Sequence, residues 1–152
     1  MKKYLFLCLM AMGCLTFTAC GSDDDEDLDD IEINEGDIKV GQAELKETSN
    51  QLILSWAISV QNIKVSVKWT CTFKDDICTK SLWEYTYPSE TYAKAAYENA
   101  MQVKDEYDRT IYSYKGKVYT EDDTADYEGD SREEIKAEME AMKIAIKEMY
   151  GR

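Results

Sequence analysis

A strict alternation of apolar and polar residues runs along the stretch IKVSVKWTCTF, residues 63–73. Its apolar side chains fall on odd positions and its polar side chains on even positions, which is typical of a β-strand with one buried face. The preceding stretch LILSWAISV, residues 52–60, alternates in a similar way, with its larger apolar residues on even positions. The two stretches therefore predict two long, half-buried strands.

Only Gln61 and Asn62 separate these strands, so the sequence predicts a β-hairpin with a two-residue turn. Such a turn pairs Val60 with Ile63, Ile58 with Val65, Trp56 with Val67, and Leu54 with Trp69. The apolar faces of the two strands then coincide. We therefore expect Trp56 and Trp69 in the core.

A third strand is expected from Ile77 to Tyr87, but its facing depends on the turn before it. A three-residue turn would place Ile77, Trp83 and Tyr85 in the core. A four-residue turn would set the two cysteines of TCTFKDDIC opposite each other and turn those aromatic residues outward. The sequence leaves both alternatives open. An earlier strand is expected within DIKVGQAELKE, where a glycine interrupts the pattern.

Two helices are expected after Pro88. Ser89 is a suitable N-cap for the first helix, whose apolar stripe is formed by Ala93, Ala96, Tyr97, Ala100 and Met101. The second helix begins with a capping box formed by Ser131 and Glu134. Its apolar residues recur at helical spacing up to Gly151, namely Ile135, Met139, Met142, Ile146 and Met149. Between the helices, TIYSYKGKVYTE predicts a short hairpin that turns at Lys115 and Gly116.

These elements together predict one α+β domain over residues 38–152. Its architecture is expected to be an antiparallel sheet of about four to six strands with two helices packed on one face. No internal repeat is visible in the sequence.

The N-terminal residues indicate a secretory signal. Lys2 and Lys3 precede the uncharged stretch YLFLCLMAMGCLTFTA, which ends in small residues before Cys20. This stretch is somewhat short for a membrane-spanning helix, and acidic residues follow it in place of a basic flank. We therefore expect residues 1–19 to be a signal peptide.

The residues around Cys20 resemble a bacterial lipobox, formed by Phe17, Thr18, Ala19 and Cys20, with Phe17 in place of the usual leucine. The following residues resemble the acidic export signal of Bacteroidota-type surface lipoproteins, namely Gly21, Ser22, Asp23, Asp24, Asp25 and Glu26. The resemblance implies that Cys20 is diacylated and becomes the mature N-terminus. It also implies an outer-membrane protein that is exposed at the cell surface. The segment from Phe73 to Ala100 is similar to a strand, proline and helix pattern of small gut-bacterial lipoproteins, which implies no function.

The chain is strongly acidic, with 18 Lys and Arg against 31 Asp and Glu. Ten of these acidic residues, and no basic residue, lie between Asp23 and Asp37. Their mutual repulsion predicts that residues 20–37 form a disordered tether. Because phosphate binding relies on clustered Lys and Arg, we expect no nucleic-acid partner. The expected membrane contact is through the lipid anchor alone.

Two of the five cysteines lie in the predicted folded domain. Cys8 and Cys14 belong to the signal peptide and Cys20 to the lipid anchor, so Cys71 and Cys78 remain. In an oxidising periplasm these two are a candidate disulfide. The alternative is a redox or zinc pair, but the chain has no histidine, so a four-ligand zinc site would need carboxylates. We expect no metal and no cofactor.

The absence of histidine also removes the commonest general base. Carboxylate pairs are the remaining catalytic route, as in glycoside hydrolysis. Asp75 with Asp76, or the cluster EDDTADYEGD at residues 121–130, supplies such pairs, although adjacent aspartates more often fill turns. The cluster does not match a calcium-binding EF-hand, because Thr124 and Ile135 occupy ligand positions. We therefore expect a protein that is not an enzyme.

Aromatic residues suggest a binding role, since exposed rings stack on sugars. The chain has 11 tyrosines and three tryptophans, and Trp83 and Tyr85 are the best candidates for exposed ligand-binding rings. The hypothesis favoured by the sequence is a noncatalytic surface lipoprotein that binds a glycan or an outer-membrane protein complex. The alternatives are a structural or interaction protein with no small ligand, and a small carboxylate-dependent hydrolase.

Overall fold

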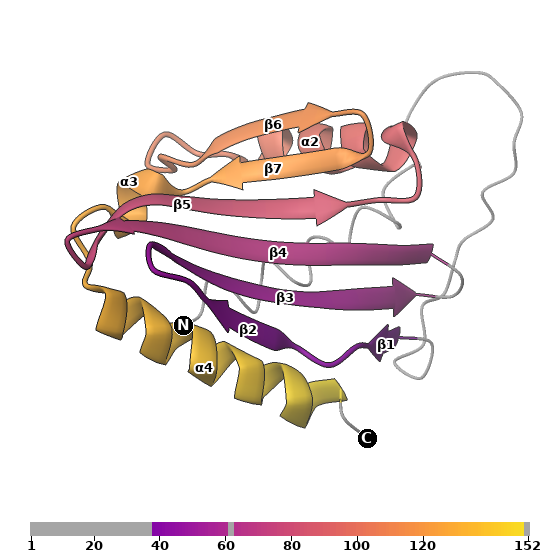
Figure 1. Cartoon of the computed structure of the whole chain (residues 1–152). Coiled ribbons are helices and arrows are strands. Elements are labelled where there is room, and N and C mark those ends of the chain that lie inside the picture. Colours follow the sequence, from indigo (N-terminus) through magenta and orange to yellow (C-terminus); the bar gives the residue numbers. More distant parts are fainter. Residues whose placement is uncertain (1–37, 61–62, 151–152) are drawn as a thin grey trace, which may run out of the picture.

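The computed structural model describes residues 38–60 and 63–150, with the side chains of residues 149 and 150 left aside (Figure 1). Its centre is the predicted hairpin of strands β3 (Gln51–Val60) and β4 (Ile63–Lys74). The four predicted pairs, Val60 with Ile63, Ile58 with Val65, Trp56 with Val67, and Leu54 with Trp69, are all confirmed. The predicted turn at Gln61 and Asn62 lies outside the described residues, as does the side chain of Met149.

The strands form one antiparallel sheet in the order β1-β3-β4-β5-β7-β6. The edge beside β3 carries two short strands, β1 (Ile38–Val40) and β2 (Glu44–Glu47), which both pair with β3. Residues 41–43 separate them, and the first of these, Gly41, donates its backbone N–H to the carbonyl of Ala57 at 2.7 Å. The predicted interruption of the earlier strand is thus confirmed.

Strand β5 (Ile77–Thr86) joins β4 through a turn that differs from both predicted alternatives. Lys74 pairs with Ile77, so the turn has only two residues, Asp75 and Asp76, which have positive φ angles of 52° and 60°. This left-handed geometry suits a tight hairpin turn of the type I′ class. The register then shifts between Thr72 and Phe73.

The register shift reverses the facing of the rest of β5. Near the turn, Cys78 is buried and Ile77 is exposed, so the three-residue alternative is wrong at Ile77. Beyond the shift, Trp69 pairs with Trp83 and Val67 with Tyr85. A β-bulge of this kind changes which residues share a face. Both aromatic residues therefore face the core, as the three-residue alternative predicted.

The remaining strands and helices follow the predicted order. Strands β6 (Ile111–Lys115) and β7 (Val118–Asp122) form the second hairpin, and β7 pairs with β5. Helix α2 (Glu90–Val103) has Ser89 at its N-cap position, without a side-chain capping bond. Helix α4 (Arg132–Tyr150) begins with the predicted capping box, in which Glu134 Oε2 accepts hydrogen bonds from Ser131 N at 3.0 Å and Ser131 Oγ at 2.6 Å. The short helix α3 (Thr124–Tyr127) was not predicted.

The helices cover one face of the sheet at its two ends. Helix α2 packs on β6 and β7, whereas α4 packs along β1, β2 and β3, as Figure 1 shows. Ala93 and Ala96 of α2 and Ile135, Met139 and Ile146 of α4 are buried in the same core as Trp56 and Trp69. Met101, predicted in the apolar stripe of α2, is instead exposed. The fold is thus an α+β domain with an antiparallel sheet.

The other face of the sheet carries the alternate side chains of the strands. In β3 and β4 these are mainly Ser, Thr, Lys and Ala, and they are half-buried or exposed. No element among the described residues contributes to the core from this side. We call it the open face.

Candidate functional site

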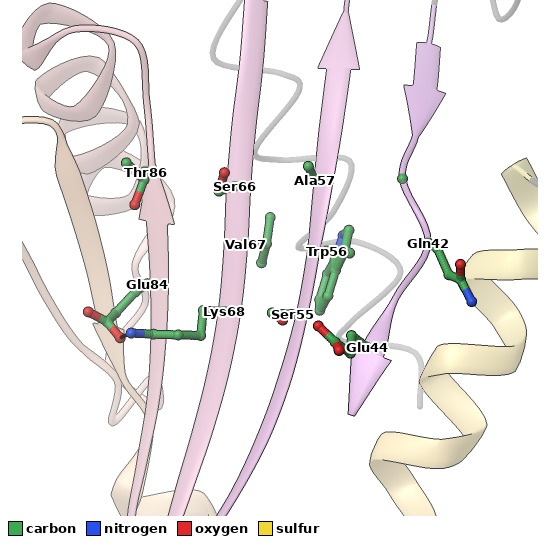
Figure 2. A pocket seen from close by; sticks show the side chains of 11 residues that line it. Gln42, Glu44, Ser55, Trp56, Ala57, Ser66, Val67, Lys68, Glu84 and Thr86 are labelled. Carbon is green, nitrogen blue, oxygen red and sulfur yellow. Dashed lines mark ion pairs between the residues drawn. The ribbon is translucent and has the colours of Figure 1, made fainter. Parts of the chain in front are cut away.

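A hollow of about 440 Å³ lies on the open face of the sheet, in the size range of many ligand pockets. It lies over β3, β4 and β5 and is bordered by the segment that joins β1 to β2. The hollow forms where adjacent strands carry small side chains, so that the surface is lower there than at its margins. Figure 2 shows the residues that line it, which are Gly41, Gln42, Glu44, Ser55, Trp56, Ala57, Ser66, Val67, Lys68, Glu84 and Thr86.

The open-face hollow has two rows of side chains in strict register across the strands. One row runs from Glu44 through Ser55 and Lys68 to Glu84, each residue pairing with the next. The ammonium group of Lys68 and the carboxylate of Glu84 form an ion pair at 2.5 Å, and Figure 2 shows this pair at one side of the lining residues. The second row is Ala57, Ser66 and Thr86. The side chains of Trp56 and Val67 belong to the core on the opposite face.

The polar side chains that line the open-face hollow can form hydrogen bonds with a ligand. Its rows present hydroxyl groups at Ser55, Ser66 and Thr86, and they carry donors and acceptors at Lys68 and Glu84. Hydroxyl groups both donate and accept, whereas ammonium groups only donate and carboxylates only accept. Such a mixture suits a ligand that itself carries many hydroxyl groups.

A second notable cluster lies on the helix-bearing face, where two carboxylates are buried. Glu121 is 7% exposed and Asp123 is 8% exposed. Tyr119 donates its hydroxyl hydrogen to Glu121 Oε1 at 2.7 Å, and Trp83 donates its indole N–H to Asp123 Oδ2 at 2.9 Å. Asp123 Oδ1 is buried without a hydrogen-bond partner in the described part of the chain. None of the ion pairs between described residues includes either carboxylate.

Burial without a counter-ion favours the protonated form of both acids. Burial raises the pKa of Glu121 to about 7, and the nearby Asp123 adds to this rise. Burial likewise raises the pKa of Asp123 to about 6, against the opposing hydrogen bonds from Ser81 and Trp83. This carboxylate cluster is therefore sensitive to pH near neutrality.

The aromatic residues predicted as exposed ligand-binding candidates lie in the interior. Trp83 and Tyr85 are each 3% exposed, so the prediction of exposed rings is wrong. Trp83 stacks on Trp69 with ring centroids 4.8 Å apart and planes 9° apart. The bulge in the β4–β5 pair explains the difference, because it returns both rings to the core face.

The candidate disulfide is not formed in the structure. Cys71 and Cys78 are both buried free thiols. Cys71 pairs with Ser81, and Cys78 pairs with Phe73, so the two cysteines are diagonal neighbours and do not lie opposite each other. Burial raises the pKa of both thiols, which keeps them protonated and poorly reactive.

The acidic residues named for catalysis do not form one site. Asp75 and Asp76 build the tight β4–β5 turn, as adjacent aspartates often do. Asp122 accepts a hydrogen bond from the hydroxyl of Thr124 at 2.5 Å, whereas the neighbouring Asp123 is bound to Trp83 in the core. No group of three or more Cys, Asp or Glu side chains able to hold a metal ion occurs within residues 38–60 and 63–150.

The remaining predicted sites lie outside the described residues. These are the signal peptide of residues 1–19, the lipidation site Cys20, the export signal Ser22, Asp23, Asp24, Asp25 and Glu26, and the tether of residues 20–37. Within the described residues, every helix is too short or too polar to cross a membrane.

Two features of the site were missed from the sequence. The open-face hollow could not be predicted from the hairpin alone, because it also needs a third strand. The sequence did contain a partial signal, since the small residues Ser55, Ala57 and Ser66 share a face in the predicted hairpin. The burial of Glu121 follows from its place two residues after the buried Tyr119 on β7, an alternation that was visible in VYTED, whereas Asp123 lies beyond the end of that strand.

Comparisons of the chain with protein-family models, with curated proteins and with solved structures find no match.

Proposed function

We propose that this protein is a noncatalytic binding module, held at the outer membrane by a lipid on Cys20, which binds a hydroxyl-rich glycan in its open-face hollow. The observation that carries the proposal is the pair of in-register polar rows lining a hollow of about 440 Å³. Sugar hydroxyl groups match the donors and acceptors of Ser55, Ser66, Lys68 and Glu84. The ligand would be held by hydrogen bonds, since the aromatic side chain among the lining residues, Trp56, is turned toward the core.

The noncatalytic part of the proposal is supported by the distribution of reactive groups. The sequence has no histidine, and the aspartates considered for hydrolysis are divided among the β4–β5 turn, the end of β7 and the core. In the open-face hollow, the carboxylate of Glu84 forms an ion pair with Lys68. This favours a role for Glu84 in hydrogen bonding to a ligand over a role in proton transfer.

The binding part is tested with the full chain in detergent on an array of oligosaccharides, followed by calorimetry with the best ligand. The variant Ser66→Tyr fills the hollow from an exposed position, so we expect affinity to fall at least tenfold. The control is Lys64→Tyr, because Lys64 is exposed two residues away on the same strand and does not line the hollow. An array without a bound glycan, or equal affinities for the two variants, would contradict the glycan proposal.

The anchoring part is tested separately by metabolic labelling with a clickable palmitate. We expect label on the wild-type protein and no label on Cys20→Ala. Replacing Asp23, Asp24, Asp25 and Glu26 with alanine should leave the label in place and abolish digestion by protease added to intact cells. An unlabelled wild-type protein would contradict the lipid anchor without bearing on the hollow.

A further inference from the structure

The loop of residues 104–110, between α2 and β6, and the ends of the two elements that it joins expose large apolar or aromatic side chains to solvent. Within the loop, Tyr107 has 82% of its surface accessible. Met101 and Val103 at the end of α2 and Ile111 at the start of β6 are exposed as well. Figure 1 shows this loop at one end of the sheet, beside α3. We call residues 101–111 the Tyr107 surface. It is separate from the open-face hollow.

The loop is held in one conformation by its own polar groups. Asp105 Oδ1 accepts the backbone N–H of Tyr107 at 2.8 Å and that of Asp108 at 2.9 Å. Asp108 in turn accepts the backbone N–H of Thr110 at 2.9 Å and the hydroxyl of Tyr112 at 2.5 Å. Tyr107 is thus presented to solvent by a loop whose backbone is hydrogen-bonded to its own side chains.

An exposed aromatic residue on an ordered loop, with other exposed apolar side chains nearby in the chain, is suited to an interface with another protein. Burying a large amphipathic ring contributes strongly at protein interfaces, and Tyr loses little conformational freedom when it binds. A loop that is already ordered avoids much of the entropy that binding would otherwise cost. The fold itself gains little from Tyr107, because most of its ring is in water.

The charges around the Tyr107 surface indicate what kind of partner fits. The cations of the loop are used internally, since Lys104 donates to the carbonyl of Thr110 at 2.6 Å and Arg109 forms an ion pair with Asp126 at 2.8 Å. Glu106 is exposed and forms no ion pair within the described residues. The outward charge beside Tyr107 is therefore negative.

We infer that the Tyr107 surface docks a partner protein that offers an apolar pocket for Tyr107 and a Lys or Arg beside it for Glu106. A second copy of this chain is a poor fit, because its formal net charge is −13. The small number of apolar side chains indicates an interface of the transient size class. This inference does not depend on glycan binding.

The test begins with a photoreactive phenylalanine analogue placed at position 107 of the full chain in intact cells. The control carries the same analogue at Lys64, on the open face. We expect one protein to be crosslinked from position 107 and not from position 64. Crosslinks to lipid alone, to a second copy of the chain, or equally from both positions would overturn the inference, as would no crosslink.

The captured protein is then purified and its affinity for the full chain is measured. We expect Tyr107→Ala to weaken binding at least tenfold, with an unchanged thermal unfolding temperature because the side chain is exposed. Glu106→Lys should also weaken binding, and reversing the facing Lys or Arg of the partner should restore it. Unchanged affinity of Tyr107→Ala would refute the role of this residue even if the crosslink were specific.

Discussion

The buried pair Glu121 and Asp123 makes the stability of the fold depend on pH near neutrality. In the folded chain the pKa of Glu121 is about 7, against an ordinary value of 4.5. Between these two pH values the folded state holds a proton that the unfolded chain has lost. The stability gained from this proton is present below pH 4.5 and is lost as the pH rises through 7. Asp123, with a pKa of about 6, acts in the same direction.

The size of the effect follows from the change in pKa. The rise from 4.5 to about 7 at Glu121 corresponds to about 3 kcal/mol of unfolding free energy. Asp123 influences Glu121, so the two acids titrate as a pair. Glu47, Asp108 and Glu134 have lowered pKa values, and the stability that they contribute is lost only in more acidic solution. The range from pH 5 to 8 therefore reports mainly on the buried pair.

The variant Glu121→Gln removes the titrating group but keeps an oxygen that accepts the hydrogen bond from Tyr119. At pH 8 we expect this variant to be more stable than the wild type by up to about 3 kcal/mol, and at pH 5 we expect similar stabilities. Urea unfolding of the full chain, followed by tryptophan fluorescence at several pH values, measures the difference. Glu128→Gln is the control, because it removes the same charge from an exposed position.

The groups that influence Glu121 are Tyr119, Tyr85, Asp123 and Asp108. If Glu121→Gln kept the pH profile of the wild type, or if Glu128→Gln removed it equally well, the reasoning from burial would be refuted.

Three further predictions concern the fold. Ser131→Ala should lower the unfolding free energy by about 1 kcal/mol in urea, because it breaks the capping box of α4, whereas Ser113→Ala on an exposed strand position should not. Asp76→Gly should have an unfolding free energy equal to or above that of the wild type in the same assay, whereas Asp76→Ala should be less stable, since residue 76 has a φ of 60°. Equal unfolding free energies for the two variants would contradict the argument from backbone strain. Peptide mass spectrometry after alkylation should find Cys71 and Cys78 unmodified in the native chain and both alkylated after unfolding without reductant, whereas a disulfide-linked peptide would contradict the structure.

The sequence predicted the β3–β4 hairpin because turn length and side-chain parity agreed along its whole length. It also predicted the start of α4, where Ser131 and Glu134 make a local hydrogen-bonding motif. The facing of β5 was left open because the sequence does not determine the length of the β4–β5 turn, which has two residues in the structure and is followed by a bulge that shifts the register by one. Neither feature has a signal as regular as alternation.

Binding features were harder to predict than the strands. The candidate rings Trp83 and Tyr85 were chosen for exposure, and the bulge placed them inside. The open-face hollow arises only when Ser66 lies between Ala57 and Thr86, which brings together residues from three strands. Tyr107 lies in an irregular loop whose backbone N–H groups bond to Asp105, and such a loop has no periodic pattern from which exposure could be predicted.

The division of one sheet edge into β1 and β2 has a consequence for solubility. An exposed strand edge attracts strands from other molecules, and a long uninterrupted edge is the most dangerous. Here an incoming strand would meet runs of only three and four residues, separated at Gly41, with Lys39 and Lys46 among them. The break in this edge thus disfavours edge-to-edge pairing between molecules and the growth of a continuous intermolecular sheet.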